Sequence, residues 1–216
     1  MIFLNKNKAS LALSLLIGIV FTNSSALASI ELQEKQIVAQ QRQCQAAITR
    51  QDLPARFKEM PASDLEDTRQ ALAQEELTVN QITGFETDNF PIGLIKSGTM
   101  SMSDRLARED SRLTRQRLLR AFAGIPEDVV STFPGANPTV SKVEELPNLD
   151  NIGDGSAAWR IPLRMAGFPV QIDLVVFQRG KIIAYVIVGY MEGDVAAVPV
   201  GDLARKLDAR ILASCR

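Results

Sequence analysis

Residues 181–191 form the most restrictive segment of the chain, because apolar side chains occupy both of its alternating positions. Successive side chains of a β-strand point to opposite faces, so a strand that is apolar on both faces is covered on both sides. The segment therefore predicts a central strand with packed elements above and below it. The two faces would carry, respectively, Ile182, Ala184, Val186 and Val188, and Ile183, Tyr185 and Ile187.

Two more strands are expected just before this one, at residues 157–165 and 170–177. Ala166-Gly167 and Arg179-Gly180 supply the turns between consecutive strands, which predicts a three-stranded antiparallel meander. Pro162 lies inside the first of these strands, and a proline there indicates a sheet edge or a bulge, since it has no N–H to donate.

A helix is predicted to follow Gly201, with Asp202 as its N-terminal cap. Leu203, Leu207 and Ile211 recur at helical spacing and form one apolar stripe. We expect this stripe to lie on the sheet.

The remainder of the chain predicts further helices and short strands, which makes the fold class α+β with a central antiparallel sheet. The expected domains are a signal peptide at 1–28, an N-terminal helical section at 29–80, and the α+β domain at 81–216. Helices are predicted at 30–50, from a capping Ser63 to 76, and at 103–123. A strand, turn and strand are predicted at 79–90 around Gly84, with strands at 94–100 and 140–146.

The first 28 residues have the pattern of a secretory signal peptide. Lys6 and Lys8 precede an apolar run at 9–21, and Ala26-Leu27-Ala28 gives a small-x-small cleavage pattern. The alternative is an uncleaved anchor, but the run is shorter than the roughly 20 residues that span a bilayer. We expect export to a periplasm, thylakoid lumen or cell exterior, with no membrane span left after cleavage.

Charge and composition exclude several functions. Losing the two lysines of the signal peptide would take the formal net charge from −1 to −3, which does not favour nucleic acid as a partner. The chain has no histidine, so Ser-His-Asp triads, Cys-His pairs and His-ligated metal or haem sites are excluded. The sequence also lacks the P-loop, GxGxxG and GxSxG motifs. We expect neither a cofactor nor a metal.

Cys44 and Cys215 are the two cysteines of the chain. In an oxidising compartment an even pair indicates a disulfide, here one that closes nearly the whole mature chain into a loop. The alternative is a pair of buried free thiols.

Residues 152–212 show a further pattern of motifs and strands in a fixed order. IGDGS (152–156) is followed by an aromatic-bearing strand and DLVVFQRG (173–180), and then by a long apolar strand and LARKLDARI (203–211). This order resembles exported bacterial domains, cyanobacterial ones among them, that are loosely similar to the Mog1/PsbP-like group. The resemblance implies a central antiparallel sheet with helices packed on it. It implies no catalytic residues.

Arg105, Arg108, Arg112 and Arg115 fall within an arc of about 80° on the predicted helix at 103–123. Arginine suits bidentate contacts with carboxylate or phosphate, so this stripe is a candidate contact for an acidic protein surface or lipid headgroups. The alternative is a solvated face with local ion pairs to Asp104 and Glu109.

Other features are weaker candidates for a site. The segment at 150–155 superficially resembles a calcium loop, but position 3 is Ile152 and position 12 is Ile161, so a turn is expected instead. Trp159, Phe168 and Tyr185 are expected in the core, with a ligand pocket as the alternative. Paired carboxylates could come from Asp150, Asp154 and Asp173, or from Glu144 and Glu145.

These observations favour an exported, non-enzymatic domain that binds a protein partner or a small ligand. The alternative is a histidine-free extracytoplasmic hydrolase or lyase that uses paired carboxylates.

Overall fold

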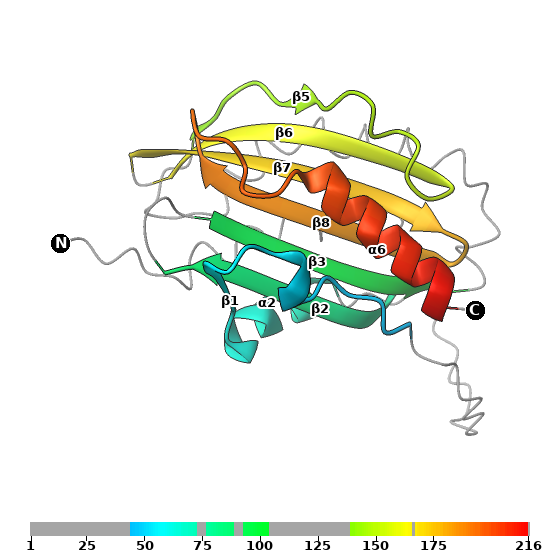
Figure 1. The fold of residues 1–216 in the computed structure, drawn as a ribbon. Coiled ribbons are helices and arrows are strands. Elements are labelled where there is room, and N and C mark those ends of the chain that lie inside the picture. The colour runs from blue at the N-terminus through cyan, green and yellow to red at the C-terminus, as the bar shows by residue number, and fades with distance from the viewer. Residues whose placement is uncertain (1–43, 73–76, 89–92, 104–138, 166, 216) are drawn as a thin grey trace, which may run out of the picture.

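The fold is built on one antiparallel sheet, seen in a computed structural model that describes residues 44–72, 77–88, 93–103, 139–165 and 167–215. The strand order is β1-β2-β3-β8-β7-β6-β4, and β5 also pairs with β6 (Figure 1). The strands are β1 (Phe57–Glu59), β2 (Leu77–Thr87), β3 (Gly93–Met102), β4 (Thr139–Val140), β5 (Glu144–Glu145), β6 (Gly155–Met165), β7 (Phe168–Arg179) and β8 (Ile182–Met191).

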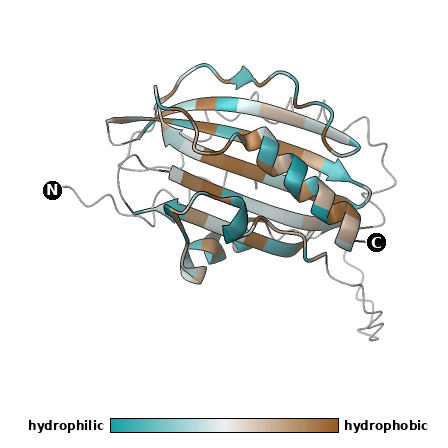
Figure 2. Cartoon of the chain, in the orientation of Figure 1, coloured by the Kyte–Doolittle hydropathy of each residue, from teal (hydrophilic) through white to brown (hydrophobic). Residues whose placement is uncertain are grey.

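The prediction of a central strand at 181–191 is confirmed. β8 lies between β3 and β7, and its residues from Ile183 to Met191 are all buried. The three-stranded meander is confirmed as well, as β6, β7 and β8 pair in sequence. Figure 2 shows hydrophobic residues running along these inner strands, as a strand with both faces covered requires.

Helices and extended chain cover the two faces of the sheet. On one face α6 (Val200–Ser214) crosses β7 and β8, beside residues 44–53, which pack on the same core and end in the 3₁₀ turn η1 (Arg50–Asp52) (Figure 1). On the other face α2 (Ala62–Leu72) packs on β2 through Leu65 and Leu72. The core is therefore divided into two layers by the sheet.

The layer under α2 contains buried polar side chains, among them Lys96 and Tyr185. Lys96 of β3 is 1% exposed, and its Nζ donates to Thr68 Oγ1 of α2 at 3.3 Å. Tyr185 lies across from Gly98, where an added Cβ would come within 2.5 Å of the tyrosine ring, so glycine leaves the space that the ring fills. Burial raises the pKa of the Tyr185 hydroxyl above its ordinary value.

Several predicted elements differ in detail from the observed ones. α6 begins at Val200 with Pro199 at the N-cap position, so the cap predicted for Asp202 is wrong: this residue lies in the first turn and accepts a hydrogen bond from Arg205. α2 begins one residue before Ser63, so Ser63 lies within the first turn. Pro162 lies in β6, whose outer side pairs, among the described residues, only with the short β4 and β5, as expected of a strand near the edge.

Two predictions of local structure are wrong. Residues 44–49 form no regular element, although a helix was expected over 30–50, whose earlier part lies outside the described residues. β2 runs unbroken through Gly84, where a turn was expected. The reason is packing, because an added Cβ at Gly84 would lie 2.7 Å from both Leu65 Cδ2 and Met60 Sδ.

The domain boundary expected at residue 80 falls inside β2, and β1 of the preceding section belongs to the same sheet. The helix predicted at 103–123 lies outside the described residues, apart from Ser103. Within the part of the chain that the structure describes, no helix has the length and apolar character needed to cross a membrane.

Candidate functional site

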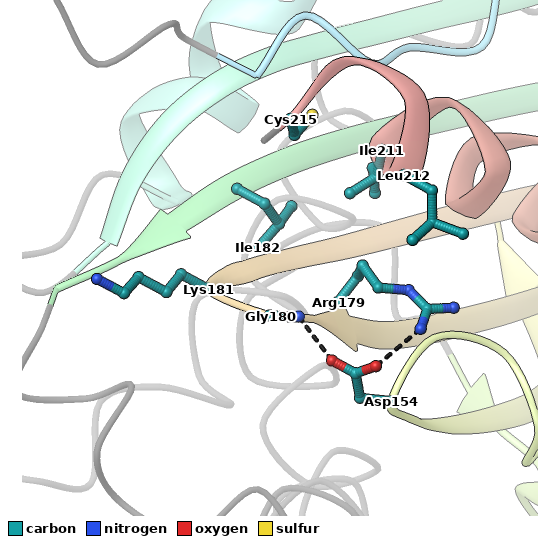
Figure 3. A pocket seen from close by; sticks show the side chains of 8 residues that line it. All are labelled: Asp154, Arg179, Gly180, Lys181, Ile182, Ile211, Leu212 and Cys215. Carbon is teal, nitrogen blue, oxygen red and sulfur yellow. Dashed lines mark hydrogen bonds and ion pairs between the residues drawn. The ribbon is translucent and has the colours of Figure 1, made fainter.

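An open hollow of about 620 Å³ lies beside the carboxyl-terminal end of α6 (Figure 3). Three segments form it: the turn before β6, the β7–β8 turn, and the last turns of α6. The lining residues are Asp154, Arg179, Gly180, Lys181, Ile182, Ile211, Leu212 and Cys215.

Glycines at two positions bring the first two segments together. Gly153 and Gly180 have φ values of 69° and 57°, in the left-handed region that favours glycine. At Gly153 an added Cβ would also clash with the carbonyl oxygen of Gln178. Asp154 can therefore lie against the β7–β8 turn, where its N–H donates to Gln178 O and its Oδ2 accepts from the Gly180 N–H, both at 2.7 Å.

Arg179 joins all three segments of the hollow. Its Nε and Nη2 donate to the two carboxylate oxygens of Asp208 in α6 at 2.8 and 2.6 Å, and its Nη1 donates to Asp154 Oδ1 at 2.7 Å. The hydrogen bonds to Asp208, followed by the charges of both carboxylates, raise the pKa of Arg179 against an opposing effect of burial. One guanidinium group thus fixes α6 and the turn before β6 to the end of β7.

Apolar side chains form the rest of the hollow. Ile211 is buried, Ile182 is half-buried, and Leu212 is 51% exposed. In Figure 3 Leu212 and Ile182 lie on either side of the space, while Lys181 extends from the turn away from Asp154. The hollow therefore combines an apolar surface with three charged residues, of which Asp154 and Arg179 are paired with each other.

A disulfide between Cys44 and Cys215 closes one side of the hollow. This pairing confirms the prediction made from the two cysteines. The two Cα atoms are 4.7 Å apart although the residues are separated by 171 positions. Cys44 is 3% exposed, so the bond ties the last turn of α6 to the buried start of the described chain.

A second ion pair holds the same end of α6 to residues 44–53. Arg210 Nη1 and Nη2 donate to the two oxygens of Asp52 at 2.6 and 2.9 Å, and Nη1 also donates to the Ala47 carbonyl. Burial opposes ionisation of Asp52, but the hydrogen bonds from Arg210 and Thr49 outweigh it and hold the pKa of this carboxyl below its ordinary value. Lys206 Nζ also lies 3.8 Å from Asp52 Oδ1, so α6 from Lys206 onward carries one covalent link and three ion pairs to other segments.

A separate polar cluster lies on the same face at the far end of β8. Arg160 donates to both oxygens of Asp173 at 2.9 Å, and the Tyr190 hydroxyl donates to Asp173 Oδ2 at 2.9 Å. Gln171 Nε2 donates in turn to the Tyr190 oxygen. Burial first, and then the bond to Asp173, raise the pKa of Tyr190. The members of this cluster satisfy one another, as buried polar groups in a folded core do.

Among the predicted carboxylate candidates, Glu145 and Asp150 line a second hollow, of about 320 Å³, on the segment between β5 and β6. Asp154 and Asp173 belong to different clusters, each bonded to its own arginine, and Glu144 and Glu145 form the exposed β5. Asp154 does share Arg179 with a second carboxylate, but that residue is Asp208, which no sequence pattern singled out. Sequence reasoning also missed Ile182 and Leu212 as lining residues, because neither stands out from the apolar pattern of its element.

Other predicted site residues have different outcomes. Arg105, Arg108, Arg112 and Arg115 lie outside the described residues, so their stripe stays a prediction. Trp159 and Tyr185 are buried in the core as expected, whereas Phe168 is 46% exposed, so its predicted place in the core is wrong. Among the described residues, the turn at 150–155 included, no group of three or more potential metal ligands is found.

Comparison with known proteins gives no relative from which to transfer a function. No protein-family model matches the chain, and no curated protein is similar to it. The resemblance to Mog1/PsbP-like domains stays a prediction.

Proposed function

We propose that this protein is an exported, non-enzymatic binding domain, and that the hollow beside the end of α6 takes a small ligand with an apolar part. The observation that carries this proposal is the exposure of Leu212, next to Ile182 and Ile211, in a cavity of about 620 Å³. Cavities of roughly 300–1,000 Å³ with apolar walls and a few placed polar groups are typical of small-molecule sites.

The hydrogen bonds that hold the carboxylates beside the hollow support binding rather than catalysis. Asp154 and Asp208 are both held by Arg179, and Asp154 also accepts from the Gly180 N–H. A hydrolase that used carboxylates would need one of them as a proton donor and the other as a base or nucleophile. Two carboxylates fixed on one guanidinium group are arranged to hold the walls of the hollow in place.

Export forms part of the same proposal. The disulfide supports an oxidising compartment, because such bonds persist mainly outside the cytoplasm. Intact-mass measurement of the protein recovered from its host tests this step, and the expected mature chain begins at Ser29, after Ala28. A chain that still carried residues 1–28 would contradict cleavage, while leaving the ligand site untested by that measurement.

The ligand site itself is tested with octanol as a probe, followed by amide chemical shifts in NMR spectra. We expect octanol to shift the amides of Gly180, Lys181 and Leu212, and we expect Leu212→Asp to abolish the shifts by placing a charge on the apolar wall. Val195→Asp is the matched control, because Val195 is 91% exposed and does not line the hollow. Shifts that persist in Leu212→Asp, or that are missing from the unmodified protein, would contradict the proposal.

A second contact surface is proposed on sequence grounds alone. Arg105, Arg108, Arg112 and Arg115 would contact an acidic protein surface or lipid headgroups. Reversal of Arg108 and Arg112 to Glu should abolish capture of such a partner, and unchanged capture would remove this surface from the proposal.

A further inference from the structure

The two cysteines of the disulfide are unequally exposed. Cys44 is 3% exposed and belongs to the apolar core under α6. Cys215 is half-buried, and it lines the hollow at the end of α6 (Figure 3). Access decides which sulfur of a disulfide is attacked in thiol–disulfide exchange. A small reagent from solvent would therefore reach the Cys215 end of the bond first.

The hollow also suits the reagent that such an exchange requires. The attacking species is a thiolate, which carries a negative charge. The charged residues of the lining are Asp154, Arg179 and Lys181, of which one is acidic and two are basic. The volume of about 620 Å³ lies in the range of roughly 300–1,000 Å³ that is typical of small-molecule sites. A small thiolate would thus meet neither a net negative lining nor a lack of space.

Hydrogen bonds of Arg210 would keep the two cysteines close to each other after the bond opens. This side chain donates to both oxygens of Asp52 and to the carbonyl of Ala47, so it holds the residues that follow Cys44 against α6. These hydrogen bonds include no sulfur atom and do not depend on the disulfide. An opened disulfide can therefore close again.

We propose that Cys215 is a site of reversible thiol–disulfide exchange with small thiol compounds. The thiolate of the compound attacks Cys215 Sγ, a new S–S bond forms between them, and the bond to Cys44 breaks. Cys44 leaves as a thiolate, which takes a proton from water. The sulfur of the compound is thereby oxidised and that of Cys44 is reduced, so no further oxidant is needed. Attack by Cys44 on the mixed disulfide reverses the reaction and releases the thiol compound.

Glutathione is the probe, added to the full protein with its disulfide intact at mildly alkaline pH. Acid stops the exchange by protonating the thiolates, and peptide mass spectrometry then locates the adduct. We expect adducts on Cys215 to exceed those on Cys44 by about tenfold or more, because Cys215 lines the hollow and Cys44 is buried. The same reaction in concentrated urea gives the ratio without the fold, and there the two adducts should be about equal.

Leu212→Trp tests the approach through the hollow. Leu212 is 51% exposed and lines the hollow one turn before Cys215, so an indole at this position should obstruct the approach to the sulfur. Adduct formation should become about fivefold slower or more, since the rate of exchange depends on access. Val195→Trp is the matched control, because Val195 is 91% exposed and does not line the hollow, and it should leave the rate unchanged.

Adducts on Cys44 as frequent as those on Cys215 would overturn the proposal, and so would a folded protein that forms no adduct where the urea sample does. An unchanged rate in Leu212→Trp would overturn the approach through the hollow. Exchange at Cys215 does not depend on the proposed apolar ligand, whose binding is measured separately with octanol. Failure of either measurement therefore leaves the other proposal in place.

Discussion

The two ends of α6 are attached to the rest of the molecule in different ways. At the amino-terminal end Val200, Leu203 and Ala204 are buried, and an added Cβ at Gly201 would lie 2.5 Å from Leu149 Cδ2. At the carboxyl-terminal end Leu212 is exposed beside the hollow, and Arg179, Arg210 and Cys215 supply the links.

This difference shows how a helix can border a cavity without losing its position. Close packing fixes the first end, where apolar area is removed from water. At the second end ionic and covalent links add to the packing of Ile211, so the space beside Leu212 need not be filled with side chains. Substitutions at the two ends should therefore act through different kinds of interaction.

The largest effect is expected from removing the disulfide. Cys44→Ser together with Cys215→Ser should lower the free energy of unfolding by about 4 kcal/mol, since the bond closes a very long loop and restricts the unfolded chain. Urea unfolding measures the change, and either single substitution should match the double one. Ser214→Ala, next to Cys215, should alter the stability by less than about 0.5 kcal/mol. A double variant as stable as the unmodified protein would show that the links at this end are mainly ionic.

Leucine truncation at each end of α6 tests the packing side of the comparison. Leu203→Ala should cost about 3 kcal/mol, because Leu203 is fully buried and its loss leaves a cavity. Leu212→Ala is the matched change at the other end, where the side chain is 51% exposed, and it should cost less than about 1 kcal/mol. Similar losses in thermal or urea unfolding would remove the distinction between the two ends.

Asp52→Asn tests the ionic side, with an expected loss of about 2 kcal/mol at neutral pH from its charged hydrogen bonds. The folded-state pKa of Asp52 lies below its ordinary value of 3.8, so the ionised carboxyl stabilises the fold above that pH. This stabilisation is lost as pH falls below 3.8 through the folded-state pKa. Urea unfolding between pH 7 and pH 2 should therefore show that the difference in free energy of unfolding between Asp52→Asn and the unmodified protein becomes smaller in acid. A difference in free energy of unfolding that is constant with pH would mean that Asp52 acts through its shape and not its charge.

The parts of the fold that could be predicted depend on local patterns. β8 was identified by apolar residues on both faces, α6 by its apolar stripe, and the turn between β7 and β8 by Arg179-Gly180. The disulfide followed from a count of cysteines and the expected compartment.

The parts that could not be predicted depend on contacts between distant segments. Gly84 has the sequence signal of a turn, but it lies within β2, where the absence of a side chain lets Leu65 and Met60 pack against the strand. Residues 44–49 have a composition tolerant of helix, yet Ile48 is buried on the sheet and Cys44 is bonded to Cys215, and these tertiary contacts outweigh weak helix propensity. The walls of the hollow are joined by hydrogen bonds of Arg179 to Asp154 and Asp208, which come from three different segments. No spacing in the sequence indicates that these residues lie together.

The pairing of β3 with β8 has a consequence for the order in which the chain acquires its structure. Gly93 pairs with Tyr190 and Ser101 with Ile182, so the middle of the sheet joins strands that are synthesised far apart. Such contacts are slow to form, because a long loop must close before any of them contributes. The sheet therefore cannot be completed until β8 has been synthesised, so its middle forms only when most of the chain is available.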